Sequence, residues 1–168
     1  MRSNNITRIS LFVALTIVGA QISIPIGSVP ITLQVLMVFL TGYLLTPKMA
    51  FLAQLVYLLM GIIGLPVFSN FSGGIAHILG PTGGYLLAFP LAAMIVAFSK
   101  NSLSSKILFG ILGLSTIYLF GVLVLSFYLK SFSKALMVGV IPFIWIDLLK
   151  LTTGILVSEK LYMLEVKQ

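Results

Sequence analysis

The sequence predicts an all-α integral membrane protein with six transmembrane helices, both chain ends in the cytoplasm, and a glycine- and proline-rich loop at the outer face between helices 3 and 4. Of the 168 residues, 60% are hydrophobic and only 8% are charged, and the mean hydropathy is +1.20. These values lie outside the range of soluble domains. A span needs ~20 apolar residues, so we expect about six spans in a single domain over residues 1–168, without an extramembrane module.

Apolar runs separated by turn residues define the expected helices. Pro25, Pro30 and Pro47 mark the first two breaks, and Asn101 with Ser102 marks a later one. The second and third runs fall below the usual ~20 residues, which indicates tilted helices or helices extended by loop residues. The expected helices are Thr7–Ile24, Ile31–Leu45, Lys48–Ile63, Gly84–Ser99, Ser105–Leu129 and Lys134–Ser158.

The positions of Lys and Arg set the expected orientation, because cytoplasmic loops retain positive charge. With both chain ends inside, seven cations lie at the inner ends of the helices, and only Lys130 and Lys134 lie outside. The charged start and the first apolar run imitate a signal peptide, but no clear cleavage site precedes Pro25, so a retained first helix is the simpler interpretation. The inner cations are Arg2, Arg8, Lys48, Lys100, Lys106, Lys160 and Lys167.

The segment Gly64–Tyr85 carries no formal charge, yet it does not have the pattern of an ordinary membrane span. Pro66, Pro81 and two Gly-Gly pairs interrupt any helix, while the Phe, Ile and Leu residues between them make a free aqueous loop too apolar. Irregular backbone at membrane depth is tolerated where protein buries it or where it lines a cavity. The expected orientation places this loop beside the Pro25–Pro30 loop at the outer face. We therefore expect it to form a wall of a binding site.

Asp147 and Lys150 are the two charged residues inside an apolar run, roughly halfway along the last expected helix. Each charge at a bilayer centre costs ~2.5–3.5 kcal/mol on insertion scales, and such residues usually face a cavity. Their i, i+3 spacing puts both on one helical face, where they neutralise each other. Two interpretations stay open: a ligand anchor that offers an acceptor and a donor, and an ion pair that only holds the bundle together.

The residues Thr82, Gly83, Gly84 and Tyr85 open the fourth expected helix. Unpaired N–H groups and the positive end of the helix dipole make such a start a seat for an anion or a carbonyl. Glycines let a ligand approach the backbone closely, Thr82 is the expected N-cap, and Tyr85 adds a ring with a hydroxyl. The alternative is a tight turn that merely re-enters the membrane.

Several further polar residues lie among apolar ones. Gln34, Gln54 and Tyr57 are expected to face neighbouring helices or a ligand, because buried amides require partners. Interhelical hydrogen bonding is the favoured interpretation for Gln54. For Gln34, interhelical hydrogen bonding and ligand contact are about equally favoured. Asn70 between two phenylalanines is a further candidate for ligand contact, while His77 has the pattern of a loop-capping residue.

Small residues recur at i, i+4 spacing on the first helix, as Ser10 with Ala14 and as Thr16 with Ala20. This spacing permits close helix approach, either by a partner subunit or within the chain.

Other function classes find little support in the sequence. The cations are scattered singly at helix ends, without the stripe that nucleic-acid binding needs. The chain has no Cys and one His, so no thiolate site or His cluster for a metal is expected, and no cofactor. Ser72 and His77 share one loop without a GxSxG elbow, so an enzyme is not expected. No Walker motif occurs, so active transport needs an ion gradient or an ATPase partner.

In combination and in order, several motifs resemble the BioY family, the biotin-specific S components of energy-coupling factor (ECF) transporters. Departures occur at Trp145 and Ile146, where the family usually has Pro-Gly, and at Ala88, where it often has Gly. The matching runs are IPIGSVPITLQ (Ile24–Gln34), YLLMG (Tyr57–Gly61), GLPVF (Gly64–Phe68), Gly73 and Gly74, GPTGGYL (Gly80–Leu86) and DLLK (Asp147–Lys150).

The resemblance implies a six-helix membrane bundle in a prokaryotic cell membrane that captures biotin from outside, alone or with a transmembrane coupling subunit and two cytoplasmic ATPases. It implicates Ser10 and Ala14 in contact with the coupling subunit. The ureido ring of biotin complements Asp147 and Lys150, its apolar parts suit Leu65, Tyr57 and Phe68, and its carboxylate suits the helix start at Thr82–Gly84. The reverse orientation, with the carboxylate on Lys150, stays open.

Three other functions remain as alternatives to biotin binding. They are an S component for another vitamin, a structural membrane subunit without a ligand, and a proton-coupled carrier with Asp147 as the proton site.

Overall fold

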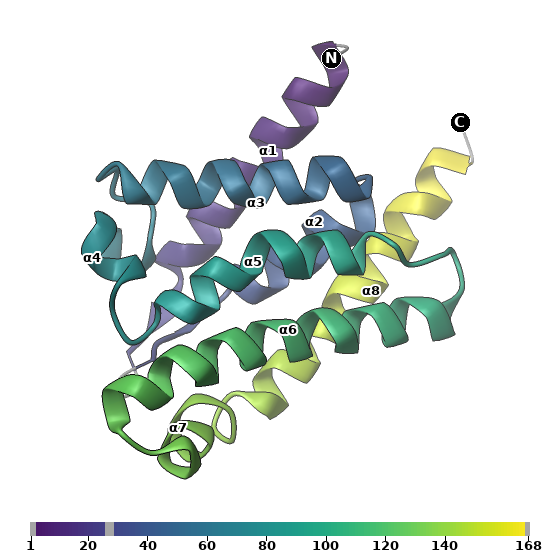
Figure 1. Ribbon diagram of the computed structural model, residues 1–168. Helices are drawn as coiled ribbons and strands as arrows, with labels where there is room; N and C mark the ends of the chain where they lie inside the picture. Colours follow the sequence, from purple (N-terminus) through teal and green to yellow (C-terminus); the bar gives the residue numbers. More distant parts are fainter. Residues whose placement is uncertain (1–2, 26–28, 167–168) are drawn as a thin grey trace.

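The computed structural model describes residues 3–25 and 29–166, and within them the fold is almost wholly helical (Figure 1). Arg2 and Lys167, which the topology prediction counted, lie outside the described residues, as do residues 26–28 of the Pro25–Pro30 loop. The elements are α1 (Ser3–Gln21), β1 (Ser23–Ile24), β2 (Ile31–Thr32), α2 (Gln34–Leu44), α3 (Pro47–Ile62), a 3-10 turn η1 (Ser69–Phe71), α4 (Ile75–Ile78), α5 (Gly83–Val96), α6 (Leu103–Leu129), α7 (Phe132–Gly139) and α8 (Ile144–Val166).

Five of the six expected helices correspond to α1, α2, α3, α5 and α6, with ends shifted by a few residues. The sixth prediction was wrong, because the expected helix Lys134–Ser158 is broken between Gly139 and Ile144, and α7 and α8 are bent by 51°. Pro142 has no N–H to donate and crowds the preceding turn, so it favours such a break. The break moves Asp147 from the expected middle of a helix to the first turn of α8.

Helix length alone does not establish six spans. In the described part of the chain, α6 is the one unbroken helix long and apolar enough to cross a membrane, and the bent pair α7 and α8 becomes a second if it is counted as one span. The apolar helices α2, α3 and α5 have 11, 16 and 14 residues, below the usual ~20.

The helices pack in a bundle in which α5 lies against α3 and α6, α2 against α8, and α1 against α2 and α3. Small residues allow the closest approach. A Cβ at Gly84 would lie 2.2 Å from the carbonyl oxygen of Phe120 on α6, and one at Gly83 would lie 1.8 Å from that of Ile78. These two glycines therefore bring protein backbone close to α5, which differs from the expectation that they admit a ligand.

A buried polar cluster joins the first three long helices. The amide nitrogen of Gln54 on α3 donates to the hydroxyls of Thr16 on α1 and Thr41 on α2, each at 3.0 Å. All three side chains are fully buried. Gln54 is thus an interhelical link, as its favoured interpretation predicted.

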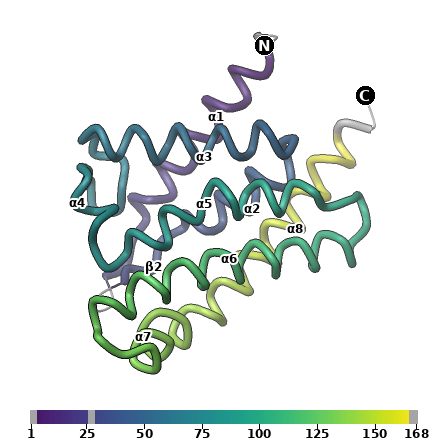
Figure 2. The backbone as a smooth tube through the Cα atoms, viewed as in Figure 1, coloured from purple at the N-terminus to yellow at the C-terminus, as the bar shows by residue number. Residues whose placement is uncertain are grey.

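The loops before α2 and before α5 are more ordered than the sequence predicted. β1 and β2 form an antiparallel pair with Ser23 opposite Thr32. The segment expected to be free of helix contains η1 and the four-residue α4. In Figure 2, β2, α4 and α7 lie on the side of the bundle away from the start of α1 and the end of α8. This arrangement brings both loops to one end of the molecule.

Candidate functional site

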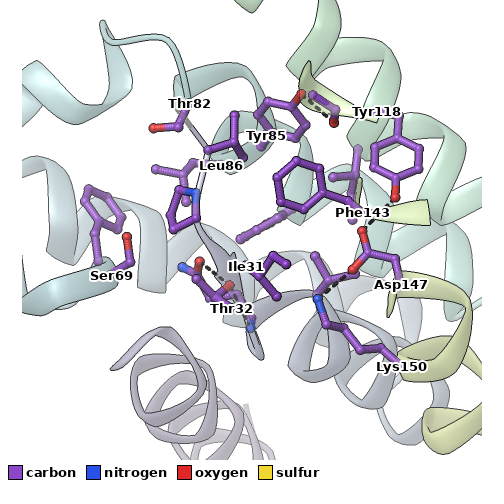
Figure 3. A pocket seen from close by; sticks show the side chains of 18 of the residues that line it. Ile31, Thr32, Ser69, Thr82, Tyr85, Leu86, Tyr118, Phe143, Asp147 and Lys150 are labelled. Atoms are coloured by element: carbon purple, nitrogen blue, oxygen red, sulfur yellow. Dashed lines mark hydrogen bonds and ion pairs between the residues drawn. The ribbon is translucent and has the colours of Figure 1, made fainter. Parts of the chain in front are cut away.

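A cavity opens at this end of the bundle, between the two loops and the break that separates α7 from α8 (Figure 3). The residues that line it come from elements that are far apart in the sequence. The lining residues are Val29, Pro30, Ile31, Thr32, Gln34, Val35, Phe68, Ser69, His77, Thr82, Tyr85, Leu86, Phe89, Ile117, Tyr118, Gly139, Phe143, Asp147 and Lys150.

The Asp147–Lys150 pair forms the charged side of this cavity. Lys150 Nζ donates to Asp147 Oδ1 at 2.6 Å, and the hydroxyl of Tyr118 on α6 donates to Asp147 Oδ2 at 2.7 Å. Asp147 is 4% exposed and Lys150 is 6% exposed. An ammonium group has three N–H donors, and the described residues occupy one of them, so Lys150 keeps donors for a ligand. A carboxylate has about four lone-pair positions, so Asp147 keeps acceptors.

The break before α8 explains how these charges reach the cavity. Asp147 lies in the first turn of α8, where the helix dipole favours a negative charge. Its backbone N–H donates to the carbonyl of Phe143 at 2.8 Å, which fixes the start of the helix. Lys150 follows one turn later on the same face, so the ion pair forms within a single turn.

Gln34 stands at the start of α2 in a chain of hydrogen bonds. Its amide oxygen accepts from the hydroxyl of Thr32 at 2.9 Å, and its amide nitrogen donates to the hydroxyl of Tyr57 at 2.5 Å. The Tyr57 hydroxyl in turn donates to the carbonyl of Val67 at 3.3 Å. Gln34 lines the cavity, whereas Tyr57 lies behind it and contacts the lining through Gln34 and Phe68.

The start of α5 supplies Thr82 and Tyr85 to the lining but neither Gly83 nor Gly84. Thr82 is the N-cap residue as expected, although its side chain makes no capping hydrogen bond. The Tyr85 hydroxyl donates to the carbonyl of Gly139 at 2.9 Å, at the end of α7. Several first-turn N–H groups already have partners, because Gly83 N–H donates to Gly80 and Tyr85 N–H donates to Thr82.

The loop before α4 supplies the aromatic wall. Phe68 packs edge-on against Tyr57 with ring centroids 5.7 Å apart, and its ring lies 6.0 Å from that of His77. Asn70, expected near the ligand, is exposed and outside the lining, and its neighbour Ser69 takes the place at the cavity. Asn70 has φ 58° and ψ 38°, a left-handed conformation that Asn tolerates better than most residues.

The sequence reasoning missed Tyr118, Thr32 and Phe143. Tyr118 had a usable signal, since a hydroxyl in the middle of an apolar helix needs a partner when it is buried. Thr32 lies two residues before Gln34, within reach of its amide. Phe143 had no signal, because only the break at Pro142 turns it toward the cavity.

The lining combines mostly apolar side chains with a few convergent polar groups, which is typical of a small-molecule site. It matches a partly apolar ligand that carries hydrogen-bonding groups. Among the residues that the structure describes, no group of three or more His, Cys, Asp or Glu side chains is placed to hold a metal ion.

A separate apolar groove lies on the outside of α1 and α3. Ser10 and Ala14 are exposed in it, while Thr16 and Ala20 face the interior. The two small-residue pairs thus have different surroundings, and only the first remains accessible to another protein. The groove is lined by Ile6, Ile9, Ser10, Val13, Ala14, Ile17, Leu52, Val56 and Met60.

Comparisons with known proteins cover almost the whole chain. A probable biotin transporter BioY of Pyrococcus horikoshii is 48% identical over 161 residues, which cover 96% of this chain and 98% of that protein. The biotin transporter BioY of Thermotoga maritima is also 48% identical over 161 residues, covering 94% and 95%.

A crystal structure of the S-component for biotin from an ECF-type ABC transporter is similar with a TM-score of 0.88 and 28% sequence identity, covering 97% of this chain and 95% of that one. This match confirms the all-α fold class. The family described as BioY matches residues 1–165, so the resemblance drawn from the sequence motifs is confirmed. The chain belongs to the BioY family.

Proposed function

We propose that this chain is a biotin-binding S component that mediates biotin uptake. Its relatives are transporters, and the chain is a transport protein of a prokaryotic membrane rather than an enzyme. The observation that carries the ligand proposal is the buried Asp147–Lys150 pair, which borders a cavity with unused donors and acceptors. The proposal needs neither a metal nor a cofactor.

Biotin matches the two sides of the cavity in chemical terms. Its ureido ring has two N–H donors and a carbonyl, which suit the remaining acceptors of Asp147 and donors of Lys150. The thioether ring and the valeryl chain suit the apolar walls at Phe68, Phe89 and Phe143. Because a site built to hydrogen-bond a polar group rejects analogues that lack it, this pair is expected to set the specificity.

Two orientations of biotin are distinguishable by the cost of burying charge. Figure 3 shows Thr82 and Ser69 on one side of the cavity and the ion pair on the other. Both of these residues are partly exposed, whereas the ion pair is buried. A third charge is more costly at the buried side, so we place the neutral ureido ring at Asp147 and Lys150 and the carboxylate near Thr82. Few N–H groups at the start of α5 are unpaired, so they offer the carboxylate little. The stronger reason to place the carboxylate near Thr82 is that water can hydrate it at this open side of the cavity.

The experiment is calorimetric titration of biotin into the full-length protein in detergent, with riboflavin and thiamine as controls. Saturable binding of biotin near one ligand per chain supports the proposal. Saturation by another vitamin points to an S component of different specificity, and no binding by a folded sample points to a structural subunit.

The orientation has its own test. Asp147→Asn is expected to weaken biotin binding at least about tenfold, which is ~1.4 kcal/mol, since the amide nitrogen cannot accept a ureido N–H. Biotin with its carboxylate converted to an amide should keep most of its affinity for the unaltered protein. Unchanged affinity in Asp147→Asn, or loss of the amide derivative, contradicts this orientation.

We further propose that Ser10 and Ala14 meet a transmembrane coupling subunit that acts with two cytoplasmic ATPases. The support is their exposure in an apolar groove, where small residues permit close helix contact. Ser10→Leu with Ala14→Leu should prevent copurification with the coupling subunit and leave biotin binding unchanged. Thr152→Leu, at an exposed position of α8, is the matched control that should leave both unchanged.

The proposed topology has six spans in one domain over residues 1–168, counting α7 and α8 as one bent span, with both chain ends in the cytoplasm. The start of α1 and the end of α8 lie toward the same side of the bundle, which supports it (Figure 1). Single Cys substitutions in a chain that has none test it. Thiol reagents that cannot cross the membrane should label a Cys at Ser69 and spare one at Asn101.

A further inference from the structure

Gln21, the last residue of α1, bonds to the loop before α4 across a large distance in the sequence. Its amide oxygen accepts from the N–H of Phe71 at 2.8 Å. Its amide nitrogen lies 3.2 Å from the carbonyl oxygen of Phe68 and 3.4 Å from that of Val67, as well as 3.3 Å from that of Ile17 in its own helix. One side chain therefore holds the loop by both a donor and an acceptor.

The held backbone is strained. Asn70 and Phe71 have φ of 58° and 53°, in the left-handed region that favours glycine. Phe71 is the less usual of the two, because a bulky side chain there is an outlier, and outliers persist only when the surroundings hold them. Phe71 is 72% exposed, so packing restrains it little. The bond from its N–H to Gln21 is a direct restraint on this conformation.

The same loop forms a wall of the cavity. Phe68 and Ser69 line it, immediately before the strained residues, and Figure 3 shows Ser69 at its edge. Gln21 itself is not among the lining residues. Its effect on a ligand is therefore indirect and passes through the position of Phe68 and Ser69.

We propose that Gln21 is a positioning residue that holds the Phe68–Ser69 wall against the bound ligand and so limits the rate at which the ligand leaves. The inference rests on the proposed biotin binding. When the hydrogen bonds of Gln21 are removed, the strained segment relaxes away from the cavity, and bound biotin loses the aromatic contact of Phe68. Entry of biotin into an open cavity does not require the wall in place, so association changes little.

The test compares Gln21→Met, which keeps the length of the side chain without its hydrogen bonds, and Gln21→Ala with the unaltered full-length protein in detergent. Asn4→Met, at an exposed position near the start of the same helix, is the control. Exchange of bound radiolabelled biotin for unlabelled biotin gives the dissociation rate. Hydrogen–deuterium exchange of the peptide that contains Phe71 reports on the hydrogen bond from the Phe71 N–H to Gln21 itself.

Both Gln21 variants should raise the dissociation rate by about tenfold, the effect of losing one or two net hydrogen bonds, and leave the association rate within about twofold. Exchange at Phe71 should become faster, and the control should match the unaltered protein. Unchanged exchange at Phe71, or faster exchange with an unchanged dissociation rate, overturns the inference. If the unaltered protein does not bind biotin, the proposed function fails, and the exchange measurement still decides whether Gln21 holds the loop.

Discussion

Removing the charges of Asp147 and Lys150 one at a time and then together separates a ligand anchor from a purely structural ion pair. The side chains of Asp147 and Lys150 are 5% and 7% exposed, and the bonded atoms are 2.6 Å apart. Loss of one partner of a buried pair costs ~3–5 kcal/mol because the other charge stays buried without compensation, whereas loss of both is often nearly neutral. Lys150→Met should therefore destabilise the protein by ~3–5 kcal/mol, and adding Asp147→Asn should recover about half of that loss or more.

Asn is the replacement chosen at position 147 because its amide oxygen can still accept from the hydroxyl of Tyr118. Thermal unfolding of the ligand-free protein measures the stability, and a loss of ~3–5 kcal/mol corresponds to a decrease in Tm of roughly 6–20 °C for a chain of this size. Lys134→Met, at an exposed position, should change the stability by less than ~0.5 kcal/mol.

Biotin titration of the same samples completes the test. A ligand anchor predicts that the double variant regains stability and still fails to bind biotin. If the double variant binds biotin as tightly as the unaltered protein, the pair is structural and the anchor is refuted. If Lys150→Met alone leaves the stability unchanged, the argument from burial is refuted.

Two further predictions concern α6. Gly84→Ala places a Cβ 2.2 Å from the carbonyl oxygen of Phe120, so it should lower the stability by ~1–3 kcal/mol, as overpacking does. Thermal unfolding checks this. An unchanged Tm would show that α5 and α6 can separate freely. Tyr118→Phe removes the hydroxyl that donates to Asp147. It should weaken biotin binding at least about tenfold, because a hydrogen bond to a charged group contributes ~1.5–3 kcal/mol. Biotin titration tests this, with Thr116→Val as the control, because it also removes one hydroxyl from the same helix. Equal affinities of the two variants would contradict a role for the Tyr118 hydroxyl.

The sequence was sufficient to predict most helices because apolar runs and turn residues are local signals. Five of the six expected helices were confirmed in position to within a few residues. The break between α7 and α8 was missed although Pro142 marks it, because the apolar run continues on both sides and outweighed one proline. The short helix α4 was missed since Gly73 and Gly74 suggested a loop throughout.

Site residues were predictable where a side chain, such as a charged one, is costly to bury without a partner. They were less predictable where the packing of the helices decides which residues reach the cavity. Asp147 and Lys150 stood out as charges in an apolar helix, and the structure brings them to the cavity. Gly83 and Gly84 stood out for the wrong reason, because a glycine that admits a ligand and one that admits a neighbouring helix have the same sequence pattern. Only the positions of α4, which lies against Gly83, and of α6, which lies against Gly84, separate the two cases.

The break between α7 and α8 is the feature that makes the cavity possible. In a continuous helix, Asp147 and Lys150 would lie mid-span, and every backbone carbonyl near them would bond within the helix. The break instead frees the carbonyl of Gly139, which accepts from Tyr85, and turns Phe143 into the lining. It also places Asp147 where the helix dipole favours its charge. The cost of interrupting the helix is thus offset by the bond from Tyr85 to Gly139, and both residues line the cavity. Lining a cavity is a condition under which a membrane protein tolerates irregular backbone.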